Sequence, residues 1–165
     1  MDISKIKLIA LDFDGVLTNN KVLLNEFGEE FVSCSRGDGL AFDALRKLQV
    51  KVVILSTEKN KVVESRAKKL NVEAIHGLNN KKEALKKLMD SLQLNKDEAI
   101  FIGNDVNDIG AMSLCEVSFC PKDSHSLVLQ RSSIVLESKG GDEIMREILE
   151  KYFKIDIYKL LYGRQ

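Results

Sequence analysis

Short apolar runs alternate with amphipathic segments along most of the chain. The apolar runs are typical of strands that are buried on both faces of a parallel sheet. We expect strands at 6–11, 50–56, 72–76, 98–104, 117–120 and 133–137. The segments between them carry apolar side chains at helical spacing. We expect helices at 39–49, 60–71, 81–94, 105–115 and 141–153.

Strands that alternate with helices predict an α/β fold, with a mostly parallel sheet and helices on both of its faces. One segment breaks the alternation, because two strand-like stretches flank a turn that contains Gly28. We expect a small hairpin there, over about residues 19–35. Asp38 is expected to cap the helix that follows. Residues 154–165 form a tail to which we assign no element.

Polar side chains stand where the predicted strands end. Asp12 and Asp14 follow the first strand, Ser56 ends the second, and the loop 103–108 follows the strand at 98–104. Lys81 begins a helix nearby in the sequence. Ligands of open α/β sheets bind at the carboxyl ends of the strands, so we expect these groups to converge there.

Composition narrows the function further. The 165 residues suit one domain, and 25 Lys and Arg balance 25 Asp and Glu, which favours neither a nucleic-acid nor a membrane-surface partner. The N-terminus has no apolar signal-peptide core, and three cysteines without a CxxC pattern fit a reducing compartment. We therefore expect a cytoplasmic protein without a membrane span, a disulfide frame or a structural zinc site.

The strand-end groups suit phosphate chemistry. Their carboxylate and amide oxygens are hard ligands that favour Mg²⁺ over zinc; the candidates are Asp12, Asp14, Asn104, Asp105 and Asp108. One carboxylate beside such a cation can attack phosphorus, and a second can protonate the leaving oxygen and then activate water. Ser56 and Lys81 would bind the oxygens of the transferring group, although Thr57 could take the role of Ser56.

Four segments resemble, in order, the motifs of the haloacid dehalogenase-like phosphatases: "DFDGVLT", "ILST", Lys81 in "HGLNNKKEAL", and "GNDVNDIGAM". The resemblance implies a Rossmann-like three-layer sandwich. It implies Asp12 as nucleophile, Asp14 as general acid and base, and phosphate contacts from Ser56 and Lys81. The metal would be held by Asp12, the Asp14 carbonyl and the fourth motif. Many members have Asp where this chain has Asn104, so Asp105 could take over as the ligand, or Asn104 could bind the metal while Asp108 orients it.

Cap domains of this superfamily are long insertions, and this chain has room only for the hairpin after its first motif. We therefore expect a capless member with an open site that a neighbouring subunit could cover. The hairpin, "GDGLAF" and "SKGGDEIMREI" resemble the 3-deoxy-manno-octulosonate 8-phosphate phosphatases and the phosphatase-like domains of CMP-sialate synthetases. That resemblance implies a homotetramer with packed hairpins. Gly140, Gly141, Arg146 and Glu147 keep part of the GGxGAxRE pattern of these relatives.

Glu58, Arg66 and Lys69 have the spacing of relatives that act on 2-keto-3-deoxynononate 9-phosphate. Arg66 and Lys69 share a helical face and could hold a sugar-acid carboxylate, while Glu58 could accept a hydrogen bond from the sugar. The sequence thus predicts a Mg²⁺-dependent phosphatase for a 2-keto-3-deoxy sugar acid phosphate, with the nine-carbon acid favoured over the eight-carbon acid.

Plainer interpretations stay open. The carboxylates could be turn or helix-capping residues, and the charged residues of 58–69 and 81–87 could be ordinary solvated helix faces. Two other functions are also possible: a catalytically weak oligomerisation module, like domains fused to cytidylyltransferases, and a phosphatase for another small metabolite.

Overall fold

The computed structural model describes residues 1–163, and its centre is a parallel sheet. The sheet has six strands in the order β5-β4-β1-β6-β7-β8, and every neighbouring pair is parallel. The strands are β1 (Leu8–Leu11), β4 (Lys51–Leu55), β5 (Glu73–Ile75), β6 (Ala99–Ile102), β7 (Val117–Cys120) and β8 (Ile134–Val135). The strand between β4 and β6 is therefore β1, which carries Asp12 at its carboxyl end.

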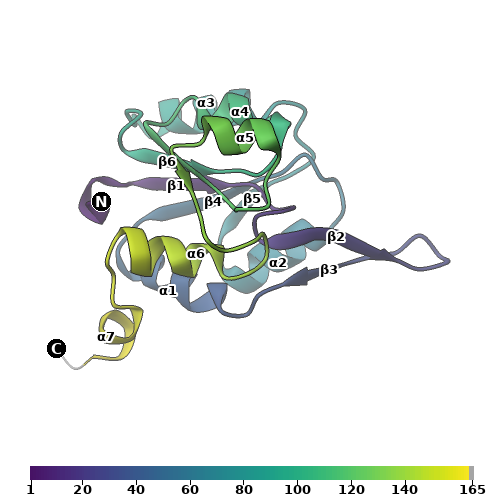
Figure 1. The fold of residues 1–165 in the computed structure, drawn as a ribbon, viewed down its shortest axis with the longest axis horizontal. Helices are drawn as coiled ribbons and strands as arrows, with labels where there is room; N and C mark the ends of the chain where they lie inside the picture. Colours follow the sequence, from purple (N-terminus) through teal and green to yellow (C-terminus); the bar gives the residue numbers. More distant parts are fainter. Residues whose placement is uncertain (164–165) are drawn as a thin grey trace.

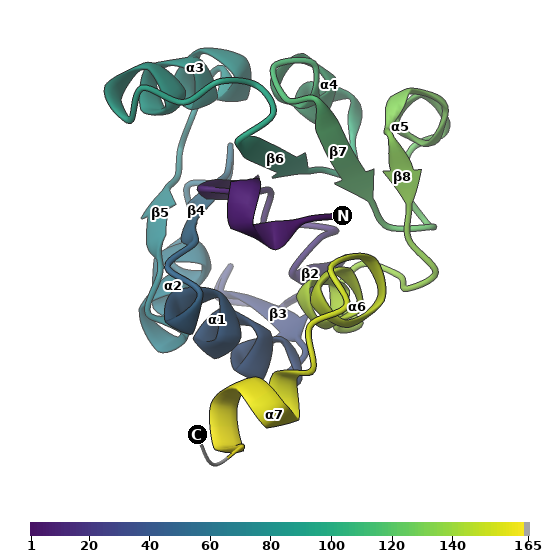
Figure 2. The ribbon, with the colours of Figure 1, turned by 90° about the vertical axis from the view of Figure 1, so that its left-hand side faces the viewer.

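Helices cover both faces of the sheet, as predicted (Figures 1 and 2). One face is covered by α1 (Asp38–Lys47), α2 (Val62–Leu70) and α6 (Ile144–Glu147), and α7 (Ile157–Tyr162) packs on the outer side of α1. The other face is covered by α3 (Lys81–Ser91), α4 (Ile109–Met112) and α5 (Ser126–Arg131). Each face of the sheet has its own apolar core. Successive side chains of a strand point to opposite faces, so Ile9 and Leu11 of β1 pack in one core and Leu8 and Ala10 in the other.

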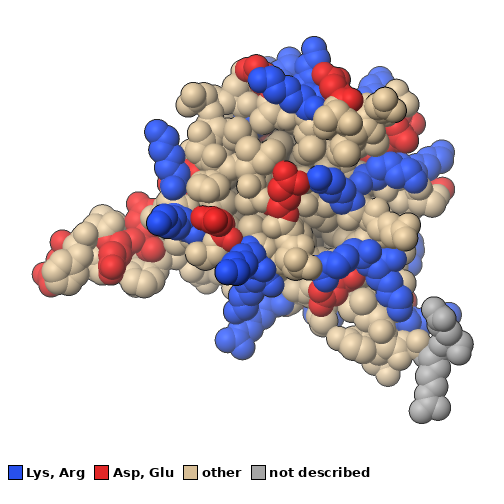
Figure 3. All heavy atoms as spheres, turned by 180° about the vertical axis from the view of Figure 1, so that it is seen from behind, with Lys and Arg blue, Asp and Glu red and all other residues tan. Residues whose placement is uncertain are grey.

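A hairpin projects from this body (Figures 1 and 3). It consists of β2 (Thr18–Leu24) and the antiparallel β3 (Glu30–Cys34), and Gly28 takes the predicted turn position with φ of 78°. The rest of the described chain between β1 and α3 adds only α1, β4, α2 and β5, so no cap domain is inserted there. The predicted capless α/β fold is confirmed. In residues 1–163, no helix combines the length and the apolar character that a bilayer crossing requires.

Three local expectations were wrong. Residues 126–131 form helix α5, although the sequence pattern predicts no element there. The segment 154–165, expected to be a tail without an element, contains helix α7. Asp38 does not cap its own helix, because its Oδ1 accepts a hydrogen bond from the Met145 N–H at 3.0 Å and so serves the start of α6 instead. The last predicted helix is present as α6, which continues as a π-helical stretch, Ile148–Tyr152.

Candidate active site

Asp12 and Asp14 leave the carboxyl end of β1 in different environments. Asp12 is buried, and its Oδ1 accepts a hydrogen bond from the Phe13 N–H at 2.7 Å. Asp14 is half-buried. Burial raises the pKa of Asp14, and the nearby Glu58 carboxylate raises it further. A carboxyl group with a raised pKa is better able to carry and release a proton.

Lys81 lies beneath Asp12 as a buried ammonium group. Helix α3 begins at Lys81, directly after its N-cap Asn80, whose side chain accepts from the Glu83 N–H. The Lys81 Nζ lies 2.7 Å from Asp12 Oδ1 and 2.7 Å from Asp108 Oδ1. Burial alone would lower the pKa of Lys81, but the two carboxylates outweigh burial and raise it. Lys81 therefore stays charged and ties the β1 end to the loop after β6.

The loop after β6 is organised by Asp108. Its Oδ2 accepts the N–H groups of Asn104 at 2.9 Å and Asp105 at 3.2 Å, and its Oδ1 accepts from Lys81. Asp105 is exposed and caps the short 3-10 turn Val106–Asp108 through the Val106 N–H. Asn104 is buried, and its Oδ1 has no hydrogen-bond partner in the described chain. A buried oxygen without a partner costs folding free energy, which makes Asn104 Oδ1 a candidate for binding a ligand.

Gly15 makes the approach of Asn104 possible. Gly15 has φ of 78°, and a side chain there would collide with the Asn104 amide. The tight turn after Asp14 therefore needs glycine twice over, for its backbone conformation and for space.

Ser56 directly follows β4 and lies near Asp12, Asp14 and Asn104. It is buried, and its Oγ accepts the Glu58 N–H at 3.0 Å, which leaves the hydroxyl proton free for an anion. Glu58 is half-exposed, and its Oε1 accepts the N–H groups of Lys59 and Asn60.

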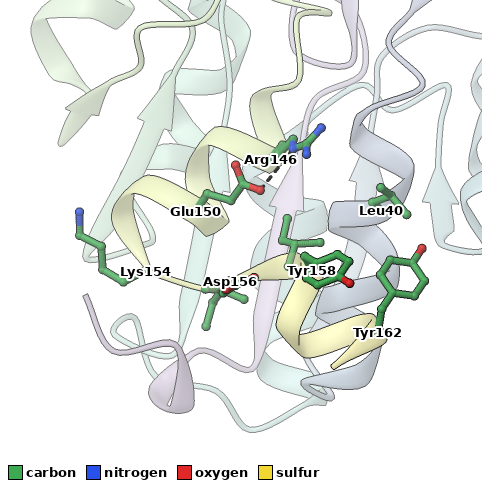
Figure 4. A pocket seen from close by; sticks show the side chains of 9 residues that line it. Leu40, Arg146, Glu150, Lys154, Asp156, Tyr158 and Tyr162 are labelled. Atoms are coloured by element: carbon green, nitrogen blue, oxygen red, sulfur yellow. Dashed lines mark hydrogen bonds and ion pairs between the residues drawn. The ribbon is translucent and has the colours of Figure 1, made fainter. Parts of the chain in front are cut away.

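A hollow of about 180 Å³ gathers most of these groups. Among the predicted residues, its lining includes Asp12, Asp14, Ser56, Asn104 and Asp105. Sequence reasoning did not single out Asn20, Val106 and Asn107, and named Thr57 only as a substitute for Ser56; all four line the hollow. The adjacent asparagines at 19–20 are a turn signal, and Asn20 does take a left-handed φ of 59°. The larger hollow in Figure 4, about 500 Å³ between α6 and α7, contains none of the predicted catalytic groups.

The predicted sugar-acid contacts do not meet in the hollow of this one chain. Arg66 Nη2 donates to the Ser35 carbonyl at 2.6 Å, at the base of the hairpin. Lys69 is exposed, and neither residue is among those that line the hollow. Their role in substrate binding stays a prediction.

The charges at the β1 end favour a cation. With both carboxylates ionised, Asp12, Asp108 and Lys81 would together carry one net negative charge in a buried place. Burial raises the pKa of Asp12 to about 7, the Asp108 carboxylate adds to the rise, and Lys81 opposes it. Among the described residues, no three acidic, His or Cys side chains converge as a metal-binding group. The oxygen donors that line the hollow include the Asp12 carboxylate and the Asn104 amide oxygen, which is unpaired within residues 1–163, and hard oxygen donors of this kind fit Mg²⁺.

Together, the parallel sheet, the paired carboxylates on its central strand and the buried lysine define a class of hydrolase. Residues 40–148 match the family described as haloacid dehalogenase-like hydrolases. The match covers more than half of the chain, and the chain belongs to this family.

Within this family, the similarity is to sugar-acid phosphatases. The chain is 28% identical over 148 residues to the 3-deoxy-D-manno-octulosonate 8-phosphate phosphatase of Yersinia pestis. The alignment covers 89% of this chain and 79% of that protein. The predicted enzyme class, a phosphoric monoester hydrolase, and the predicted resemblance are confirmed.

Solved structures agree with this placement. A hydrolase of the family from Streptomyces avermitilis superposes with a TM-score of 0.86 at 36% identity, covering 99% of this chain and 88% of that one. The octulosonate 8-phosphate phosphatase of Moraxella catarrhalis, in complex with a magnesium ion, a phosphate ion and a KDO molecule, gives a TM-score of 0.85 at 26% identity and covers 96% and 88%.

Proposed function

We propose that this protein hydrolyses the phosphate monoester of a 2-keto-3-deoxy sugar acid with the help of Mg²⁺. The observation that carries the proposal is Asp12, which is oriented by Lys81 and lines a polar hollow together with Asp14 and Ser56. Asp12, Asn104 and the Asp14 carbonyl would hold the ion, with Asp105 as the further candidate. Asp108 would orient the loop, since both of its oxygens already accept hydrogen bonds.

In the proposed reaction, an Asp12 oxygen forms a bond to phosphorus while the bond from phosphorus to the sugar oxygen breaks. Asp14 donates its proton to that leaving oxygen. Water, from which Asp14 then removes a proton, cleaves the aspartyl phosphate and regenerates Asp12. Ser56 and Lys81 bind the phosphoryl oxygens, where negative charge is spread in the transition state. The bound Mg²⁺ supplies neutralisation of that charge.

Two observations bear on the length of the sugar acid, and they favour different acids. The curated relatives described above are 3-deoxy-D-manno-octulosonate 8-phosphate phosphatases, which take an eight-carbon acid. The spacing of Glu58, Arg66 and Lys69 favours a nine-carbon acid, and we retain this preference. Comparing kcat/KM for the two acid phosphates on the same protein decides between them. A higher value for the eight-carbon phosphate would overturn the preference while leaving the phosphatase proposal intact.

We also propose that the chain assembles as a homotetramer whose hairpins pack together. The hairpin exposes large apolar side chains, among them Leu23 at 71% and Phe27 at 80%. A subunit packed there would bury these side chains and bring new groups near each open hollow. The alternative function as an oligomerisation module predicts the same assembly without phosphate release.

Asp12→Asn tests the proposed mechanism. An amide cannot form the aspartyl phosphate, so phosphate release from either sugar acid phosphate should fall by at least about 10³-fold. Asp90→Asn, an exposed carboxylate on α3, is the matched control and should keep full activity. Chelation of Mg²⁺ should abolish wild-type release, and added Mg²⁺ should restore it.

Unchanged turnover in Asp12→Asn would refute the role of Asp12. A wild-type protein that releases no phosphate from any tested ester, yet forms tetramers, would instead support the oligomerisation module.

A further inference from the structure

Thr18 makes two contacts with the loop that carries Asp14 and one with Asn20 in β2. Its side chain is fully buried where β2 begins. The hydroxyl oxygen accepts the Gly15 N–H at 3.1 Å and the Asn20 N–H at 3.2 Å. The same hydroxyl donates to Asp14 Oδ1 at 3.4 Å.

These contacts fix the direction of the hydroxyl proton. A threonine hydroxyl has two acceptor lone pairs and one proton. Both lone pairs face backbone N–H groups, so the proton can point only toward Asp14. The distance of 3.4 Å is long for a hydroxyl-to-carboxylate hydrogen bond, so the contact is a weak one.

A second segment presses on the same loop from outside. We call residues 137–142 the glycine strap. The Gly141 N–H donates to the Val16 carbonyl at 2.9 Å. A Cβ on Gly140 would come within 2.9 Å of the Thr18 carbonyl oxygen and still closer to that of Gly15. Only glycine allows this backbone-to-backbone approach.

The glycine strap is itself anchored by two carboxylates. Asp123 Oδ1 accepts the Gly140 N–H at 2.9 Å. Glu147 accepts the N–H groups of Glu137 at 2.9 Å and Ser138 at 2.8 Å. The loop 13–18 is therefore held between the β1 end and an anchored strap, and it has little freedom to carry Asp14 elsewhere.

We propose that Thr18 is a positioning residue for Asp14, with the glycine strap holding the loop on which both lie. Thr18 holds Oδ1 of Asp14, so that Oδ2, which accepts no hydrogen bond from the described residues, is left to face the leaving oxygen. The inference rests on the proposed function for its consequence in catalysis, but the placement of Asp14 can be measured without any turnover.

The kinetic test compares leaving groups. p-Nitrophenolate leaves without protonation, whereas a sugar alkoxide needs the proton of Asp14. Asp14 also activates water in the second step for both esters, so the comparison uses kcat/KM, which reports only the steps up to departure of the leaving group. In Thr18→Val, kcat/KM for 3-deoxy-manno-octulosonate 8-phosphate should fall on the order of tenfold, and kcat/KM for p-nitrophenyl phosphate should change less than about twofold. Thr18→Ser keeps the hydroxyl and should restore kcat/KM for the sugar phosphate. If Thr18→Val does not fold, Thr18→Ala takes its place, because it leaves room for a water at the Gly15 N–H.

The structural test is crystallographic and independent of activity. Wild type and Thr18→Ser should show the Asp14 carboxylate beside residue 18, and Thr18→Val should show it in a different rotamer. An unmoved Asp14 in Thr18→Val, or equal losses of kcat/KM for both esters, would overturn the positioning role. A wild type that hydrolyses neither ester would count against the proposed function alone, and the Asp14 rotamer would still decide the inference.

Discussion

At the scale of single residues, the chemistry depends on how each charge is compensated. Lys81 serves two buried carboxylates at once, Asp12 and Asp108, each at 2.7 Å. Neither carboxylate could stay buried and ionised without a cation beside it. Lys81 thus has a structural role in addition to the phosphate contact that we propose.

This double role predicts a large loss of stability in Lys81→Met. The substitution keeps the bulk of the side chain but leaves buried charges unpaired, which costs about 3–5 kcal/mol of unfolding free energy. Urea unfolding in Mg²⁺-free buffer measures the loss. The neighbouring Lys82 is exposed, so Lys82→Met should stay within about 0.5 kcal/mol of wild type. Equal stability of the two variants would mean that the ion pairs contribute no net stability.

At the scale of elements, the glycine strap shows how a late segment supports an early one. Residues 137–142 lie far from Asp14 in the sequence, yet the backbone of Gly140 packs against that of Gly15 and Thr18. From the sequence, Gly140 and Gly141 are known only as part of a pattern shared with the resembling phosphatases. The contact with the loop 13–18 could not be anticipated, because it depends on how β8 and α6 are placed.

Gly140→Ala should therefore destabilise the protein, because a Cβ has no space against two backbone carbonyls. The expected loss is about 1–3 kcal/mol in thermal or urea unfolding. Gly39 in α1 has open space around its Cβ position, and Gly39→Ala should leave stability unchanged or slightly raise it. A Gly140→Ala protein as stable as wild type would show that the strap can move away, which would weaken its role in holding the loop.

At the scale of the whole molecule, the open hollow and the projecting hairpin can both be explained by assembly of several subunits. The hollow of about 180 Å³ is small for a sugar acid phosphate, so the hollow in one chain provides little grip on the sugar. The hairpin meanwhile exposes apolar surface, which marks an interaction site. Assembly through the hairpin would address both features.

The proposed assembly makes a measurable prediction. Light scattering on wild type should give the mass of a tetramer, and the double variant Leu23→Ser, Phe27→Ser should give a smaller species, because it removes apolar area from the contact. Tyr158 is also exposed, at 75%, but lies on α7, away from the hairpin. Tyr158→Ser should therefore keep the tetramer. A monomeric wild type, or a double variant that stays tetrameric, would contradict the proposed contact.

Most of the fold could be predicted from the local sequence pattern, and the errors of that prediction are confined to short segments. The six parallel strands were predictable because strands buried on both faces are continuously apolar. Helices α5 and α7 were missed because each is only six residues long and shows too little periodicity. The capping role of Asp38 was misplaced because its partner, Met145, lies on a helix that only the folded chain brings near.

The sequence by itself determined the class of chemistry, because the order and spacing of the carboxylates, Ser56 and Lys81 are written along the chain, and parallel strands bring their ends together. Only the tertiary structure decided which oxygens are already engaged and which are free. Both oxygens of Asp108 already accept hydrogen bonds, Asn104 Oδ1 has no partner among residues 1–163, and the Thr18 hydroxyl donates to Asp14. The physical reason is that a side chain's remaining hydrogen-bonding capacity depends on neighbours distant in sequence, and those neighbours are known only once the chain has folded.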